Sequence, residues 1–217
     1  MDNIINPLML SLRISVIATT IAFLIGIFCA WWFAYKKSKL TSFLSIVITI
    51  PLVIPPTVLG YYLLLLLGRG SFIGQWTEAL TGQTIVFTWR AAVVAAVIAA
   101  LPLLVRPIQA SFESIDVDVI HAAEIDGASK FRVLLHIITP LAYKGILAGL
   151  VLGFARAMGE FGATLMVAGN IPGKTQTLSI AIYDAVQANR MMDAHIMVLI
   201  LTVTTILFLL LIHRWFK

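Results

Sequence analysis

The chain has 217 residues, of which 60% are hydrophobic and 12% are charged, and its mean hydropathy is +1.01. A soluble globular domain has about 25% charged residues, so this composition excludes that class and indicates an integral membrane protein. The net charge of +5 does not indicate nucleic-acid binding, because the basic residues form no stripe interleaved with aromatic residues. A single cysteine, Cys29, excludes an intrachain disulfide and a cysteine-rich metal site. We expect an all-α polytopic protein, with residues 1–217 as one transmembrane domain and no cofactor.

Apolar runs of about 20 residues, the length that crosses a bilayer, recur along the chain. The first covers residues 14–34 and ends in Trp31 and Trp32, an aromatic belt typical of a membrane interface. The residues before it lack the basic leader of a secretory signal. The second run covers residues 43–67. Pro55 and Pro56 predict a break or kink there, because proline removes a backbone donor. Such a break either lines a transport pathway or is a tolerated packing feature.

Three further spans follow in chain order. Residues 68–84 are expected to be an external loop rich in glycine, and residues 85–105 a third span with Trp89 and Arg90 near the outer surface. The fourth span covers residues 146–168, an external segment covers 169–193, and the last span covers 194–212. Five spans place the two ends of the chain on opposite sides of the membrane.

The distribution of basic residues predicts which side is which. Positively charged residues favour cytoplasmic loops, and an external N-terminus puts nine of the 15 basic residues inside and five outside, with Arg156 in the membrane. The inside set is Lys36, Lys37, Lys39, Arg106, Lys130, Arg132, Lys144, Arg214 and Lys217, and the outside set is Arg13, Arg69, Arg90, Lys174 and Arg190. We therefore predict an external N-terminus and a cytoplasmic C-terminus.

Residues 118–140 form the longest polar interval of the chain and lie in a cytoplasmic loop of about residues 113–142. Their pattern predicts two short helices separated by a turn. Asp118 is the expected N-cap of the first helix, and Gly127 is the expected left-handed residue after it. Ser129 is the expected N-cap of the second helix, which ends before Pro140.

This interval resembles the cytoplasmic coupling loop of ABC-importer permeases, which docks on a separate ATPase subunit. The resemblance rests on residues at matching spacing: Ala122, Ala123, Gly127, Ile137 and Pro140. His121 and Thr139 depart from the pattern, since the family usually has Glu and Leu there, and the His121 change puts an acidic contact in doubt. The resemblance implies an ATPase-coupling set of Asp118, His121, Ala122, Ala123, Glu124, Gly127, Ala128, Ile137 and Pro140. The alternative is an ordinary amphipathic loop.

The fourth span carries charges and closely spaced glycines. Arg156 and Glu160 are four residues apart, so on one helix they would share a face and could pair. A charge inside a span is costly and marks either a pathway or a structural ion pair. Gly149 and Gly153, and then Gly159 and Gly162, favour close approach of another backbone. The candidate pathway and gate residues are Arg156, Gly159, Glu160, Phe161, Gly162, Pro55 and Pro56.

Residues 155–185 are similar to the permeases of molybdate importers, and the Gly-Glu-Phe-Gly run at 159–162 is also found in sulfate permeases. The resemblance covers essentially the whole chain. It implies a homodimer of permeases, two cytoplasmic ABC ATPase subunits and an external oxyanion-binding protein, in the cytoplasmic membrane of a bacterium or archaeon. The chain would perform no covalent chemistry. The cargo could also be tungstate or sulfate, and the competing classes are an ATPase-independent channel or secondary transporter and a non-transporting scaffold.

Two other patterns are not expected to form sites. Residues 168–175, AGNIPGKT, fit a relaxed phosphate-loop pattern, but they follow a span instead of a strand, and Pro172-Gly173 is typical of a type II turn. The four histidines have no metal-ligand spacing. The threonines, including Thr84 and Thr88, are expected to be packing hydroxyls.

Overall fold

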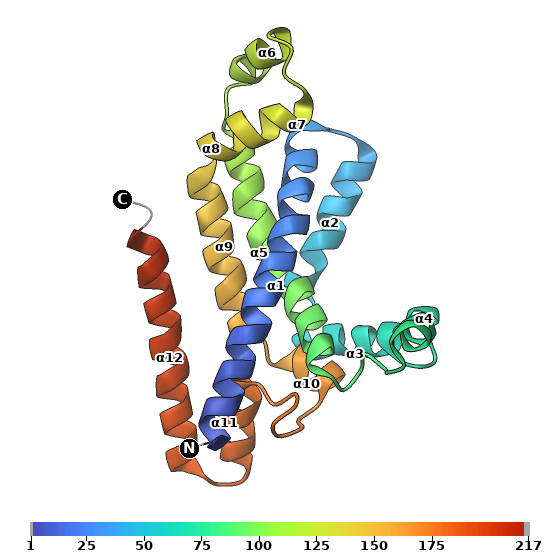
Figure 1. The fold of residues 1–217 in the computed structure, drawn as a ribbon, viewed down its shortest axis with the longest axis vertical. Coiled ribbons are helices and arrows are strands. Elements are labelled where there is room, and N and C mark those ends of the chain that lie inside the picture. The colour runs from blue at the N-terminus through green and yellow to red at the C-terminus, as the bar shows by residue number, and fades with distance from the viewer. Residues whose placement is uncertain (1, 215–217) are drawn as a thin grey trace.

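The structure is a computed structural model that describes residues 2–214, and every regular element in that range is a helix (Figure 1). The all-α class predicted from composition is confirmed. Lys217, which was counted among the cytoplasmic charges, lies outside the described residues.

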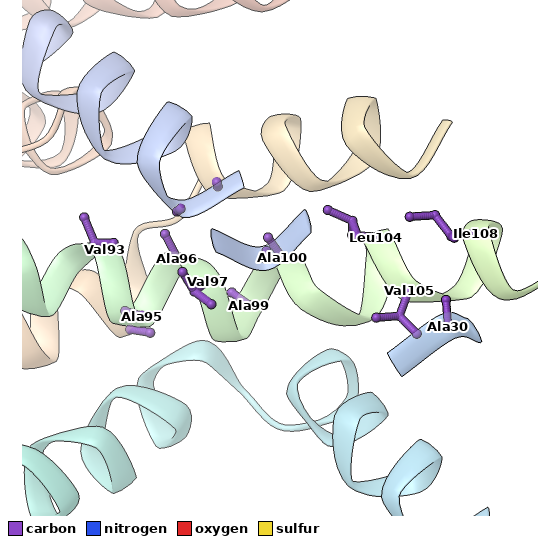
Figure 2. Close-up of a cluster of buried hydrophobic side chains, with 14 of the residues drawn as sticks. Ala30, Val93, Ala95, Ala96, Val97, Ala99, Ala100, Leu104, Val105 and Ile108 are labelled. Carbon is purple, nitrogen blue, oxygen red and sulfur yellow. The ribbon is translucent and has the colours of Figure 1, made fainter. Parts of the chain in front are cut away.

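Three helices form the centre of the molecule: α1 (Asp2–Tyr35), α5 (Trp89–Glu113) and α9 (Tyr143–Met158). Helix α5 packs against both of the others. Much of its buried surface is alanine, including Ala96 and Ala100 (Figure 2), and small side chains allow backbones to approach closely where burial of apolar area cannot drive association.

Glycines bring α9 against α5, as the sequence predicts. A Cβ at Gly149 would lie 2.7 Å from the Leu104 carbonyl oxygen, and one at Gly153 would lie 3.3 Å from the Leu104 side chain. Gly162 similarly faces Pro56, at 2.9 Å from its Cβ. Within the described part of this chain no other helix approaches Gly159, because a Cβ there would meet only the carbonyl oxygen of Ala155 in the preceding turn, at 3.5 Å.

The second apolar run is broken at its proline pair, as predicted. Helix α2 (Lys39–Val53) ends before the break, and α3 (Pro56–Leu67) begins with Pro56 and turns away by 118°. Pro55 and Pro56 supply no N–H donors, so the helical ladder cannot continue through them. Pro51 lies inside α2 without ending it.

The remaining helices surround this centre. The expected external loop 68–84 contains α4 (Phe72–Thr81), and the expected external segment 169–193 contains α11 (Leu178–Gln187). Helix α10 (Gly162–Ala168) packs on α3 and α5. Helix α12 (Met191–His213) stands at the edge of the molecule beside α11, and most of its surface is exposed (Figure 1).

The described residues contain three helices long and apolar enough to cross a membrane, and five spans if each bent helix pair is one span. Several span boundaries differ from those expected. The third span begins as a helix at Trp89 instead of residue 85 and continues to Glu113. The fourth is not continuous over 146–168: α9 ends at Met158, and the stretch bent against α9, by 80°, is the one before it, Lys130–Leu141. Arg156 is therefore in the last turn of a helix.

Candidate functional site

The segment 113–142 projects beyond one end of the helix bundle, opposite to α10, α11 and the N-terminus (Figure 1). Its first helix, α6 (Val117–Ile125), is capped by Asp116, whose carboxylate accepts a hydrogen bond from the Asp118 N–H at 3.0 Å. The predicted N-cap, Asp118, is wrong: the observed cap lies two residues earlier in the chain. Both aspartates are chemically suited to capping, and the helix begins two residues earlier than the apolar pattern indicated.

The turn after α6 matches the prediction. Gly127 has φ +84°, in the left-handed region that glycine adopts at low cost. The Ala128 N–H donates to the Ala123 carbonyl at 3.0 Å, and the Gly127 N–H donates to the Glu124 carbonyl at 3.1 Å. This pair of hydrogen bonds is a Schellman motif, and it fixes the direction in which the chain leaves α6.

The second helical stretch begins at the predicted cap. The Ser129 hydroxyl accepts from the Arg132 N–H at 3.4 Å, and α7 (Lys130–Val133) follows. A π-helical turn then covers Leu134–Ile138 and leads into α8 (Thr139–Leu141). Pro140 lacks an N–H, which accounts for an irregular ladder here, and nothing in the apolar spacing predicts the π-turn itself.

The predicted coupling residues divide into two groups. Ala123, Ala128 and Ile137 are half-buried against the apolar core, which is anchored further by the buried side chains of Ile120 and Leu134. The others are exposed: Asp118, His121, Ala122, Glu124, Gly127 and Pro140. The segment is therefore held to the bundle by one face and presents the other.

The presented face is unusually apolar for a segment outside the bundle. Ile125 is 85% exposed, and large apolar side chains on both helical stretches are also exposed. These are Val117, Val119, Phe131 and Leu135. Large apolar side chains gathered on one exposed segment are typical of a protein–protein interaction surface.

A second candidate site lies at the break between α9 and α10. Arg156 Nη1 lies 2.6 Å from Glu160 Oε2, so the predicted ion pair forms. Its expected basis is wrong, because α9 ends at Met158 and the two residues do not share a helix face. The Glu160 side chain is only 2% exposed and that of Arg156 is 24% exposed. Oε2 has no other partner among the described residues, so Arg156 is the group that compensates for its burial.

Glu160 has a further role that its sequence position does not reveal. Its Oε1 accepts a hydrogen bond of 2.8 Å from the Ala163 N–H, in the first turn of α10. The carboxylate therefore satisfies a free donor at a helix start, where a negative charge is also favoured by the helix dipole. The adjacent Phe161 ring packs 5.2 Å from the ring of Tyr183.

The two helix breaks meet. Gly162 lies against Pro56, and Gly60 of α3 is so close to α10 that a Cβ there would be 2.8 Å from Ala163 Cα. The candidate pathway residues at 55–56 and 159–162 thus form one region, although more than 100 residues separate them in the chain. Non-helical backbone at membrane depth is tolerated where it is buried in protein or lines a cavity.

The stretch that fits a relaxed phosphate-loop pattern is a loop in the structure. Residues 169–177 form a loop after α10, in which Gly173 has φ +74° and the Lys174 N–H donates to the Ile171 carbonyl at 3.0 Å, as in a type II turn. Among the described residues no group of three histidine, cysteine, aspartate or glutamate side chains could hold a metal ion.

Comparison with known proteins bears on both sites. The putative molybdenum transport system permease protein YvgM of Bacillus subtilis is 41% identical over 209 residues, which is 96% of this chain and 92% of that protein. The molybdenum transport system permease protein ModB of Haemophilus influenzae is 44% identical over 84% of this chain and 80% of its own length. ModB of Escherichia coli K12 is 39% identical over 97% and 92%.

Solved structures show the same fold. An inward-facing structure of the MetNI methionine ABC transporter matches with a TM-score of 0.74 at 16% identity, covering 97% of this chain and 93% of that chain. An amino acid ABC transporter matches with a TM-score of 0.68 at 22% identity, covering 98% and 92%. The fold is thus that of the type I ABC-importer permeases. The family described as binding-protein-dependent transport system inner membrane component matches residues 22–217, and the chain belongs to this family.

Proposed function

We propose that this chain is the membrane-spanning permease subunit of an ATP-driven importer for molybdate. The observation that carries the proposal is the identity of 39–44% with molybdenum transport permeases over nearly the whole chain. The exposed apolar face of segment 113–142 adds independent support, because a permease of this family needs a docking surface for its ATPase.

The transport mechanism is alternating access. Two copies of the chain surround a central path, two cytoplasmic ATPases bind the two 113–142 segments, and an external binding protein delivers the oxyanion. ATP hydrolysis takes place on the ATPase, and the permease performs no covalent chemistry. Closure of the ATPases moves the paired segments and rocks the helix bundles, provided that the segment binds differently in the two states.

The orientation of the chain follows from this assignment. Segment 113–142 lies in the cytoplasm, the N-terminus is outside and the C-terminus is inside. The asymmetry of nine internal to five external basic residues supports this arrangement.

The region where the two helix breaks meet is the gate of the path. Glu160 and Arg156 form a charged contact there, and Phe161 with Gly162 links it to Pro55 and Pro56 of the second break. An ion pair at a helix break can separate when the two helices move, whereas a pair within one rigid helix cannot. The competing role for the pair is purely structural.

Transport in proteoliposomes tests the proposal. The permease is reconstituted with its ATPase and binding protein, and uptake of labelled molybdate is measured with ATP or a non-hydrolysable analogue inside. We expect uptake only with hydrolysable ATP, ATPase and binding protein together. Uptake through the permease alone would indicate a channel or secondary transporter, and stronger competition by sulfate or tungstate than by molybdate would change the cargo.

A further inference from the structure

A cavity of about 380 Å³ opens at the end of the molecule opposite to segment 113–142. Three stretches far apart in the chain line it: the N-terminal third of α1, residues 83–90 before and at the start of α5, and the loop after α10. Neither the pairing of Arg156 with Glu160 nor the coupling segment involves this cavity.

The charge of the cavity is entirely positive. Its lining includes Arg13, Arg90 and Lys174 and contains no aspartate or glutamate. Among the side chains that the structure describes, none of these three cations has a carboxylate within ion-pair distance, although Arg69, Arg156 and Arg190 all do. Three unpaired cations around one cavity repel each other and attract anions.

The two arginines are held on one aromatic ring. The guanidinium carbon of Arg13 lies 4.3 Å from the centroid of the Trp89 ring, and that of Arg90 lies 5.9 Å from the same centroid. Stacking of this kind orders a long side chain while leaving its N–H donors available. The planar donor groups of two arginines suit the oxygens of an oxyanion.

The backbone contributes a further attraction. Helix α5 has 25 residues and begins in the cavity wall, and its N-cap Thr88 makes no side-chain capping hydrogen bond. The first N–H groups of this helix and its dipole therefore favour an anion at the same place. The threonine hydroxyls are not free donors, since Thr88 donates to the Ile85 carbonyl and Thr175 to the Gly169 carbonyl.

We propose that this cavity is an oxyanion-binding site, which takes a tetrahedral dianion such as molybdate, tungstate or sulfate at the outer end of the permease. Arg13, Arg90 and Lys174 supply the charge, and Lys174 comes from the stretch whose sequence resembles a phosphate loop. That the site lies on the transport path rests on the proposed function, since the outer end is where a binding protein would release its cargo. Its ability to bind an oxyanion does not depend on which one is transported.

Direct binding tests this site. The permease–ATPase complex in nanodiscs, without binding protein, is titrated with labelled molybdate at low ionic strength, and unlabelled sulfate and chloride are used as competitors. The variants are Arg13→Gln, Arg90→Gln and Lys174→Gln. Arg69→Gln is the matched control, because Arg69 is an exposed arginine at the same end that pairs with Glu78 at 3.1 Å. Gel filtration confirms that each complex is assembled.

We expect saturable binding to the unaltered complex that sulfate displaces and chloride at equal ionic strength does not. Each arginine variant should weaken binding at least tenfold, Arg13→Lys should weaken it less than Arg13→Gln, and Arg69→Gln should leave it unchanged. Absence of binding to the unaltered complex overturns the site. So does binding by Arg13→Gln and Arg90→Gln that is as tight as binding by the unaltered complex. If the arginine variants bind molybdate as the unaltered complex does, and a separate pull-down shows that they have lost only their affinity for the binding protein, the cations are a docking surface and the site is also overturned. Arginine-dependent binding in a complex that does not import molybdate upholds the site while refuting the proposed cargo.

Discussion

Removing the two members of the Arg156–Glu160 pair should have unequal costs. Arg156→Met leaves the Glu160 carboxylate, which is 2% exposed, without its cation. Breaking a buried pair in this way costs about 3–5 kcal/mol. Glu160→Gln leaves Arg156, which is 24% exposed and can be solvated in part, and the glutamine oxygen can still accept from the Ala163 N–H. The cost should then be about 1.5–3 kcal/mol, the value of one charged hydrogen bond.

Glu160→Ala separates the two contacts of the carboxylate. It removes the acceptor of the Ala163 N–H as well as the ion pair, so it should cost about 1 kcal/mol more than Glu160→Gln. The double variant Arg156→Met/Glu160→Gln leaves no buried charge and should recover much of the loss from Arg156→Met. Thermal stability of the assembled complex, followed by fluorescence-detected gel filtration, measures each difference.

Transport by the double variant decides between gate and structural pair. If the pair belongs to the gate, the double variant assembles but does not import molybdate, measured as uptake per assembled complex. Full transport by the assembled double variant would show that the pair only holds α9 to α10. Equal destabilisation by Arg156→Met and Glu160→Gln would refute the burial argument itself.

Three further predictions follow from the topology and the packing. In a cysteine-free background, a cysteine at Ser71 should react with an impermeant thiol reagent in intact cells and one at Ser129 should not; labelling of Ser129 alone would invert the orientation. Gly127→Val should insert normally but lose the ATPase during purification, because a β-branched residue opposes φ +84°, whereas Gly127→Asn should retain it; equal retention by both would remove the turn from the coupling argument. Gly149→Ala should lower thermal stability by about 1–3 kcal/mol and Gly153→Ala by less, because the new Cβ meets a backbone oxygen at 2.7 Å in the first case and a side chain at 3.3 Å in the second; the reverse order would contradict the packing of α5 on α9.

The helix break at the proline pair could be predicted from sequence because its cause is local. Pro55 and Pro56 remove backbone donors whatever surrounds them. The second break could not be predicted in the same way, since residues 159–161 contain no proline and the stretch 146–168 is apolar enough to be one span. Its only signal in the sequence was a charged residue, Glu160, inside an apolar stretch and between Gly159 and Gly162. The close packing of α10 on α3 stabilises the irregular backbone.

Hydropathy indicated where the membrane is crossed but not where helices begin and end. Helix α1 starts at Asp2, twelve positions before the apolar span expected from residue 14, because a helix can continue beyond the hydrocarbon core. The coupling segment shows the opposite case. Gly127 and Ser129 were predictable since a left-handed turn and an N-cap each need a particular residue type. Residue type alone does not choose between Asp116 and Asp118, because both are good N-cap residues.

Capture of the ATPase by the exposed apolar face of segment 113–142 tests the central claim most directly. A photo-crosslinking amino acid is placed at Ile125, which is 85% exposed, and in a separate variant at Phe72, which is 83% exposed on α4, far from that segment (Figure 1). With a tagged ATPase coexpressed, irradiation of the Ile125 variant should produce a permease–ATPase adduct, and the Phe72 variant should produce none. An adduct from Phe72, or none from Ile125 in a complex that still imports molybdate, would contradict the assignment of this segment as the ATPase-coupling surface.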